Sequence, residues 1–166
     1  MNDTFYVAAA IALLSTALAI SRANGVHALL YLVISLLAVA LVFYTLGAPF
    51  AAALEMIVYA GAIVILIVFL VMMLNLGEAA SAREAQWMKP RAWIGPSLLA
   101  IILEAEIISI LNIGIAGSPG PQVISPRDVG IAMFGPYLLC VELASMLLLA
   151  ALVGAYHLAA IEHRGG

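Results

Sequence analysis

The residues of this sequence that could do chemistry are carboxylates inside long apolar runs. The stretch LEMIVYAGAIVILIVFLVMMLNL, residues 54–76, carries Glu55 and, four residues later, Tyr59. Residues four apart lie on one face of an α-helix, so the Tyr59 hydroxyl would extend a polar stripe begun by Glu55. A charged side chain at the membrane centre costs about 2.5–3.5 kcal/mol, so Glu55 needs a polar partner, a proton or water. We interpret Glu55 as a site on a proton or ion path; the alternative is a neutral carboxyl group that hydrogen-bonds a neighbouring helix.

Small residues accompany this stripe. Ala51, Ala52 and Ala62 lie on or beside the Glu55 face, where they would let a partner helix approach closely. The pattern therefore predicts that the stripe faces protein and not lipid. Gly61 lies at the middle of the same run, where it indicates either close helix packing or a hinge or π-bulge.

Three further carboxylates lie in later apolar runs. Glu142 is three residues before Ser145, and both face the same way on a helix. We interpret Glu142 either as a residue that forms a structural hydrogen bond to another subunit or as part of a proton path. Glu104 and Glu106 lie near the midpoint of their run and, two residues apart, point about 200° away from each other. They cannot share one partner face, and we assign them no role.

The composition places these residues in a membrane. Of 166 residues, 66% are hydrophobic and only 9% are charged, and the mean hydropathy is +1.20, which is outside the usual range of soluble domains. The single cysteine, Cys140, allows no intrachain disulfide and no thiolate metal site within the chain. The net charge of −3, without a basic patch, excludes a nucleic-acid partner.

A hydrocarbon core about 30 Å thick requires apolar helices of about 20 residues. Five such runs predict an all-α integral membrane protein, a single membrane domain over residues 1–166, with spans at about 4–21, 26–46, 50–76, 92–113 and 137–158. Asn24 is a predicted N-cap and Gly47 a predicted helix stop. Asp128 could cap a short helix that Gly135 and Pro136 interrupt.

The charges in the loops predict the orientation, because Lys and Arg are retained on the cytoplasmic side. If five helices alternate, one side holds all the basic residues but Arg127, namely Arg22, Arg83, Lys89, Arg91 and Arg164. The N-terminus is therefore expected outside and the C-terminus in the cytoplasm. Residues 77–91 would form a cytoplasmic loop and residues 114–136 an outer loop.

Three stretches carry a family resemblance: GVHALLYLVISLL, ALEMIVYAGAIVILIVFLVMMLNL and FGPYLLCVELASMLLLAALV. They resemble the best-marked parts of the subunit J family of proton-pumping NADH:quinone oxidoreductase, respiratory complex I. Members share five helices, a glutamate and a tyrosine in the third helix, and an ELAS motif in the fifth. The likeness covers most of the chain, although the carboxylates Glu104 and Glu106 depart from the mostly apolar fourth helix of the family.

The resemblance implies a multi-pass subunit of the bacterial inner membrane, with other membrane subunits of complex I and the lipid bilayer as partners. The subunit would couple quinone reduction to proton translocation near the junction between the quinone site and the proton channels. It would bind no cofactor and hold no catalytic centre, whereas the assembly would use NADH, FMN, iron–sulfur clusters and quinone for electron transport.

In this family the third helix can carry a π-bulge, here at the positions Tyr59 to Val64. Its appearance and loss would open or close a water path. The implied proton-path or gating residues are Glu55, Tyr59, Gly61, Ala62, Val64 and Glu142. One extra residue in a helical turn rotates the side chains beyond it by about 100°. Two other functions remain open: a free-standing small cation carrier and a passive membrane scaffold.

Overall fold

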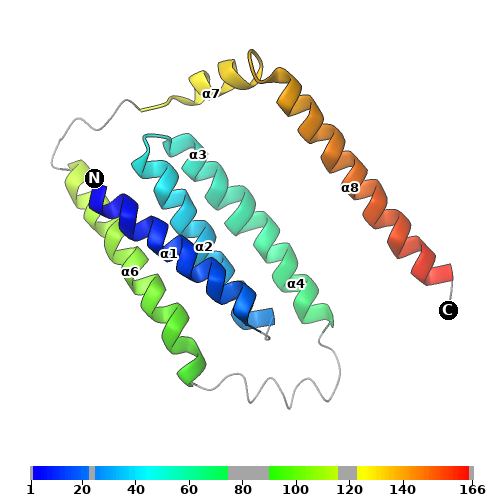
Figure 1. Ribbon diagram of the computed structural model, residues 1–166, viewed down its shortest axis with the longest axis horizontal. Helices are drawn as coiled ribbons and strands as arrows, with labels where there is room; N and C mark the ends of the chain where they lie inside the picture. The colour runs from blue at the N-terminus through cyan, green and yellow to red at the C-terminus, as the bar shows by residue number, and fades with distance from the viewer. Residues whose placement is uncertain (1, 23–24, 75–89, 116–122, 165–166) are drawn as a thin grey trace. The chain divides into compact units, whose positions relative to one another are not determined.

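The computed structural model describes residues 2–22, 25–74, 90–115 and 123–164, and all regular structure in these ranges is helical (Figure 1). Five helical segments are long and apolar enough to cross a membrane, namely Asp3–Ser21, Gly25–Thr45, Pro49–Val71, Trp93–Asn112 and Leu138–His157. The prediction of an all-α protein with five transmembrane helices is thereby confirmed. The predicted orientation stays a prediction. Residues 77–89 of the predicted loop at 77–91 lie outside the described residues. Asn24, the predicted N-cap, lies outside them as well.

The first two spans pack along a seam of small and hydroxyl side chains. Helix α1 (Asn2–Ser21) and helix α2 (Gly25–Thr45) run side by side. The hydroxyls of Thr16 and Ser35 are hydrogen-bonded at 2.7 Å, and Ser35 also donates to the Ala12 carbonyl at 3.1 Å. In lipid the hydrophobic effect does not drive helices together, so close packing and such interhelical hydrogen bonds hold this pair.

The core of this bundle lies between α1, α2 and helix α6 (Pro90–Ile115). Each helix contributes apolar side chains that are almost fully enclosed: Ala8, Ile11, Ile34, Ala38, Leu41 and Leu103. Because Leu103 is the member from α6, the α6 face that carries Leu103 packs against the other two helices. The α6 side chains away from Leu103 are largely exposed.

A second contact joins the same three segments through Tyr31, whose side chain is only 3% exposed. The guanidinium carbon of Arg22, which directly follows α1, lies 5.4 Å from the centre of the Tyr31 ring, within cation–π range. On α6, Gly95 lies so close to the Tyr31 hydroxyl that a Cβ at position 95 would overlap it. The absence of a side chain at Gly95 therefore makes room for Tyr31.

The turn into the third span follows from one glycine and one proline. Gly47 has φ 81°, a left-handed conformation that glycine adopts without strain. Its N–H donates to the Tyr44 carbonyl and the Ala48 N–H to the Phe43 carbonyl, both at 3.0 Å, the hydrogen-bond pattern of a Schellman C-cap. Pro49 then begins helix α3 (Pro49–Leu54), where its missing N–H has no cost. The helix stop predicted at Gly47 is confirmed.

The contacts divide the chain into two compact units, Met1–Val123 and Ile124–Gly166. The second unit holds helix α7 (Pro126–Met133) and helix α8 (Leu138–Arg164), separated by a turn that contains Gly135 and Pro136, as predicted. That residues 1–166 form a single membrane domain stays a prediction.

The cap of α7 corrects one expectation. The N-cap is Ser125, and Asp128 is the third helical residue. The Ser125 side chain accepts from the Asp128 N–H at 3.2 Å, while the Asp128 carboxylate accepts from the Ser125 N–H at 3.2 Å. This reciprocal capping box places Asp128 inside the helix, because a side chain can reach back to the N-cap from the third position.

We expect Ser125→Ala to weaken α7 by about 1 kcal/mol, because the Asp128 N–H loses a side-chain acceptor. Amide hydrogen exchange of the peptide covering α7 in the purified protein should then accelerate about fivefold. Ser97→Ala, at an exposed serine of α6, is the matched control and should leave α7 unchanged. Equal exchange rates in the Ser125→Ala protein and the original protein would contradict a stabilising role for the capping box.

Candidate functional site

The third span changes its helical type where the predicted site residues lie. Between α3 and helix α4 (Val64–Leu74) runs η1 (Glu55–Ile63), a π-helical segment of 9 residues. At its end the Val64 N–H donates to the Tyr59 carbonyl, five residues back, which is the π-helical spacing. Glu55, Tyr59, Gly61 and Ala62 all lie inside η1, and Val64 directly follows it. The segment begins earlier than the range Tyr59–Val64 that the family resemblance implies.

The Gly61 backbone lies close to the preceding π-helical turn. A Cβ at position 61 would lie 3.2 Å from the carbonyl oxygen of Met56, closer than side chains normally approach such an atom. Any larger residue would crowd this carbonyl in the π-helical form. The lack of a side chain at Gly61 therefore leaves room for the Met56 carbonyl oxygen in the π-helical form.

Burial differs sharply along this segment. The Val64 side chain is 3% exposed, whereas Tyr59 is 50% exposed and Glu55 is half-buried. Within the described part of the chain, neither Glu55 nor Tyr59 makes a side-chain hydrogen bond or an ion pair. Within the described part of the unit Met1–Val123, the helices thus enclose Val64, cover Glu55 in part and leave half of the Tyr59 side chain exposed. That a protein neighbour covers them stays a prediction.

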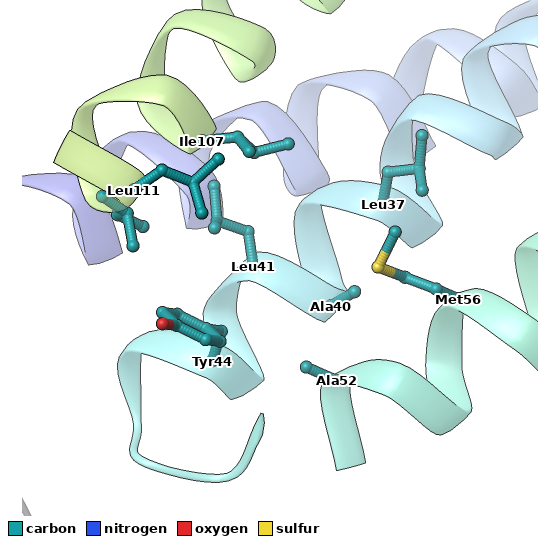
Figure 2. Close-up of a pocket in the computed structure, with 9 residues that line it drawn as sticks. Leu37, Ala40, Leu41, Tyr44, Ala52, Met56, Ile107 and Leu111 are labelled. Carbon is teal, nitrogen blue, oxygen red and sulfur yellow. The ribbon is translucent and has the colours of Figure 1, made fainter. Parts of the chain in front are cut away.

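The face of the third span that meets the other helices is apolar. An open cavity of about 190 Å³ lies between α2, the α3–η1 junction and α6. Figure 2 shows Met56 reaching from η1 toward Leu37 of α2, with Ala52 one turn earlier. The cavity is lined by apolar side chains and the Tyr44 ring, namely Leu37, Ala40, Leu41, Tyr44, Ala52, Met56, Ile107, Ile110 and Leu111. Glu55 and Tyr59 are not part of this lining, so packing within the chain and the polar stripe use different sides of the span.

Depth in the membrane sets the cost of the Glu55 carboxylate. Glu55 lies five residues from the middle of the span Pro49–Val71, at most about 8 Å along the axis. The hydrocarbon core extends about 15 Å to either side of its centre. Glu55 is therefore inside the core, and Gly61 lies next to its middle.

The remaining predicted site residue, Glu142, lies in the second unit, on α8. It is exposed, and the Ser145 hydroxyl donates to its backbone carbonyl at 2.7 Å. Ser145 is therefore satisfied by the backbone and does not bond to the Glu142 carboxylate. Whether Glu142 forms a bond to another subunit or takes part in a proton path stays untested.

The two carboxylates of the fourth span behave as their spacing predicts. Glu104 is exposed and Glu106 is half-buried, consistent with side chains that point about 200° apart. Among the described residues, no group of three or more His, Cys, Asp or Glu side chains is arranged to hold a metal ion.

Two features of the structure have little or no signal in the sequence. The early start of the π-helical segment, at Glu55, has no signal in the residue types, because Leu54, Glu55 and Met56 all suit an α-helix. The contact of Tyr31 with Gly95 joins two separate spans. The only local signal for it is the glycine before Pro96, a position where close approach of another helix is common.

Comparison with known proteins identifies the chain's relatives. Residues 15–158 match the family model described as NADH-ubiquinone/plastoquinone oxidoreductase chain 6. NADH-quinone oxidoreductase subunit J of Pseudomonas aeruginosa is 56% identical over 159 residues, which cover 95% of this chain and 96% of the relative. The subunit J of Escherichia coli K12 is 55% identical over 169 residues, covering 99% of this chain and 90% of the relative. The subunit J of Buchnera aphidicola from Schizaphis graminum is 46% identical over 162 residues, covering 95% and 97%. On this likeness, which extends over almost the whole length of both chains, the protein belongs to the family of subunit J of NADH-quinone oxidoreductase, respiratory complex I.

Proposed function

We propose that this chain couples quinone reduction to proton translocation in NADH:quinone oxidoreductase, through a third span that changes between π-helical and α-helical forms. The chain is a multi-pass protein of the bacterial inner membrane and a subunit of an oxidoreductase. The observation that supports the coupling role is the π-helical segment Glu55–Ile63, which holds a carboxylate inside the hydrocarbon core.

The change of form is a local exchange of hydrogen bonds. In the π-helical form the Val64 N–H bonds the Tyr59 carbonyl. In an α-helical form it would bond the Ala60 carbonyl, four residues back, and the Tyr59 carbonyl would accept from the Ile63 N–H instead. Loss of the extra residue in the turn would rotate Val64 and the residues beyond it by about 100° relative to Glu55.

The membrane makes this rotation inexpensive. In water, turning the buried Val64 outward would expose apolar surface, but in a bilayer its new neighbours are lipid tails or another apolar helix. The Val64 side chain therefore exchanges one set of apolar contacts for another. The Tyr59 hydroxyl and the Glu55 carboxyl group would supply polar groups for a short water path. Ala62 adds little bulk on this exposed side.

In this proposal the chain holds no catalytic centre and binds no cofactor. FMN, the iron–sulfur clusters and the quinone belong to the other subunits, which are also its partners. The N-terminus faces outside and the C-terminus faces the cytoplasm, so the segment at residues 77–91 lies on the cytoplasmic side. Glu142 serves either as a second polar station or as a bond to a neighbouring subunit.

Native gel electrophoresis of the tagged chain, solubilised in mild detergent, tests this function. We expect the chain to migrate in a large assembly that oxidises NADH with quinone. Migration of the chain as a small oligomer, outside any such assembly, would support the carrier alternative and reject the proposal.

Replacement of Glu55 by Gln tests whether the carboxyl group carries protons. Glutamine keeps the hydrogen bonds but cannot ionise, so we expect proton pumping per electron to fall while the assembly forms normally. Removal of a proton-transfer group costs about a hundredfold in rate where that group is essential. The measurement is the proton-to-electron ratio in membrane vesicles, with Glu55→Asp as the variant that retains an acid. An unchanged ratio in Glu55→Gln would leave Glu55 with a hydrogen-bonding role only.

A further inference from the structure

The outward face of α6 carries a carboxylate at the middle of the membrane that the proposed function does not use. Glu104 lies within the span Trp93–Asn112, about 2 Å along the axis from its midpoint. With about 15 Å of hydrocarbon on either side, the short side chain reaches neither water nor lipid headgroups from this depth. Its polar partner must therefore come from within the membrane.

The described helices of the unit Met1–Val123 do not provide that partner. Glu104 is exposed, and within the described residues its carboxylate has no hydrogen bond and no ion pair. The adjacent Leu103 is 3% exposed and belongs to the core with α1 and α2. Glu104 thus lies beside the packed face of α6, on the part that this unit leaves uncovered.

The residues near Glu104 on the same face suit a closely packed helix. Ser97 and Ala100 lie seven and four residues before Glu104, both exposed, and small side chains at this spacing let two helix backbones approach. Ile108 lies four residues after it and is 51% exposed. On this face, small side chains at one end would let a second helix approach closely. A carboxylate lies at the centre, and an apolar side chain at the other end could pack against the same helix.

From this arrangement we infer that the face formed by Ser97, Ala100, Glu104 and Ile108 is an interface with a transmembrane helix of a neighbouring subunit that carries a basic side chain at the membrane centre. Charge complementarity selects this partner, because lipid tails offer no hydrogen-bond donor and a basic side chain at this depth needs a carboxylate as much as Glu104 needs a donor. The inference depends on the chain's place in a multisubunit membrane enzyme, which is the proposed function. It adds a contact that does not involve the third span.

Assembly measurements test the interface. In Glu104→Leu we expect the share of the chain recovered in the NADH-oxidising assembly on native gels to fall roughly fivefold, the size of one interhelical polar contact. Glu104→Gln, which retains hydrogen-bonding groups, should fall less. Ser109→Leu removes an exposed polar residue from another side of α6 and should assemble normally. Equal recovery of Glu104→Leu and the original chain would overturn the inference.

Photo-crosslinking identifies the occupant directly in the full assembly. A benzophenone amino acid at position 104 should form a covalent product with a second subunit, mapped by mass spectrometry to a transmembrane peptide with Lys, Arg or His. The same probe at Ile102, about 200° around the helix, should not give this product. Products at position 104 with lipid alone, or with a second copy of this chain, would overturn the inference. If the chain migrates outside the NADH-oxidising assembly, the proposed function fails, while the product at position 104 still decides what covers α6.

Discussion

Gly61→Val is expected to slow NADH:quinone turnover strongly while the enzyme still assembles. In the π-helical form the first side-chain carbon would lie 3.2 Å from the Met56 carbonyl oxygen, and valine adds two methyl groups to it. Overpacking of this kind costs about 1–3 kcal/mol. A bias of this size shifts an equilibrium between two forms about 5–150-fold. If turnover requires the π-helical form, its rate should fall by a factor in that range.

The controls for this prediction separate a conformational effect from a folding defect. Gly61→Ala introduces the same carbon without the methyl groups and should show a smaller loss. Gly154→Val makes the same substitution in the span of α8, where no atom of the described residues lies within 4 Å of the added carbon, and should leave turnover unchanged. Activity per assembled complex is the quantity to compare. Parallel loss of assembly and activity in Gly61→Val would argue against a gate at this position.

The five spans were predictable because the bilayer imposes their length. An apolar run of about 20 residues has few other structures available to it, so the ranges read from the sequence overlap the helices observed. The end of α2 was predictable for a second reason. Only glycine adopts a φ of 81° without strain, so Gly47 before Pro49 indicates a helix end wherever it occurs.

The π-helical segment was foreseen only through the family resemblance, and its start was placed too late. An α-helix and a π-helix of the same residues differ by one position in the acceptor of each N–H, and no residue type in η1 requires the wider turn. Gly61 permits this geometry without dictating it. The side chains along the segment differ in burial: Val64, which follows it, is almost fully enclosed, whereas Met56 lines the cavity next to α2.

Candidate site residues were predictable from their cost, and their surroundings were not. A carboxylate in an apolar run indicates a polar role wherever it lies, so Glu55, Glu104 and Glu142 could be found in the sequence. Which side of each helix the chain itself covers depends on contacts between distant segments. The structure leaves Tyr59 half-exposed and encloses Val64, a difference that spacing alone does not give.

Gly95→Ala is expected to destabilise the bundle of α1, α2 and α6, because the new Cβ would overlap the hydroxyl of Tyr31. Tyr31 is almost fully enclosed, and its ring stacks with the Arg22 guanidinium, so it cannot move away freely. Overpacking in such a place costs about 1–3 kcal/mol. At about 2–4 °C per kcal/mol, the midpoint temperature at which the purified assembly loses this subunit should fall by several degrees.

The double variant Gly95→Ala with Tyr31→Phe distinguishes this overlap from a general effect of alanine at position 95. Phenylalanine removes the overlapped oxygen and keeps the ring beneath Arg22, so most of the lost stability should return. The ring carbon that bears the oxygen would still lie 3.3 Å from the Cβ, so the recovery should be incomplete. Residues in direct contact show interaction energies of about 0.5–3 kcal/mol in such cycles. Strictly additive effects of the two substitutions would mean that Gly95 acts through the helix itself and not through its contact with Tyr31.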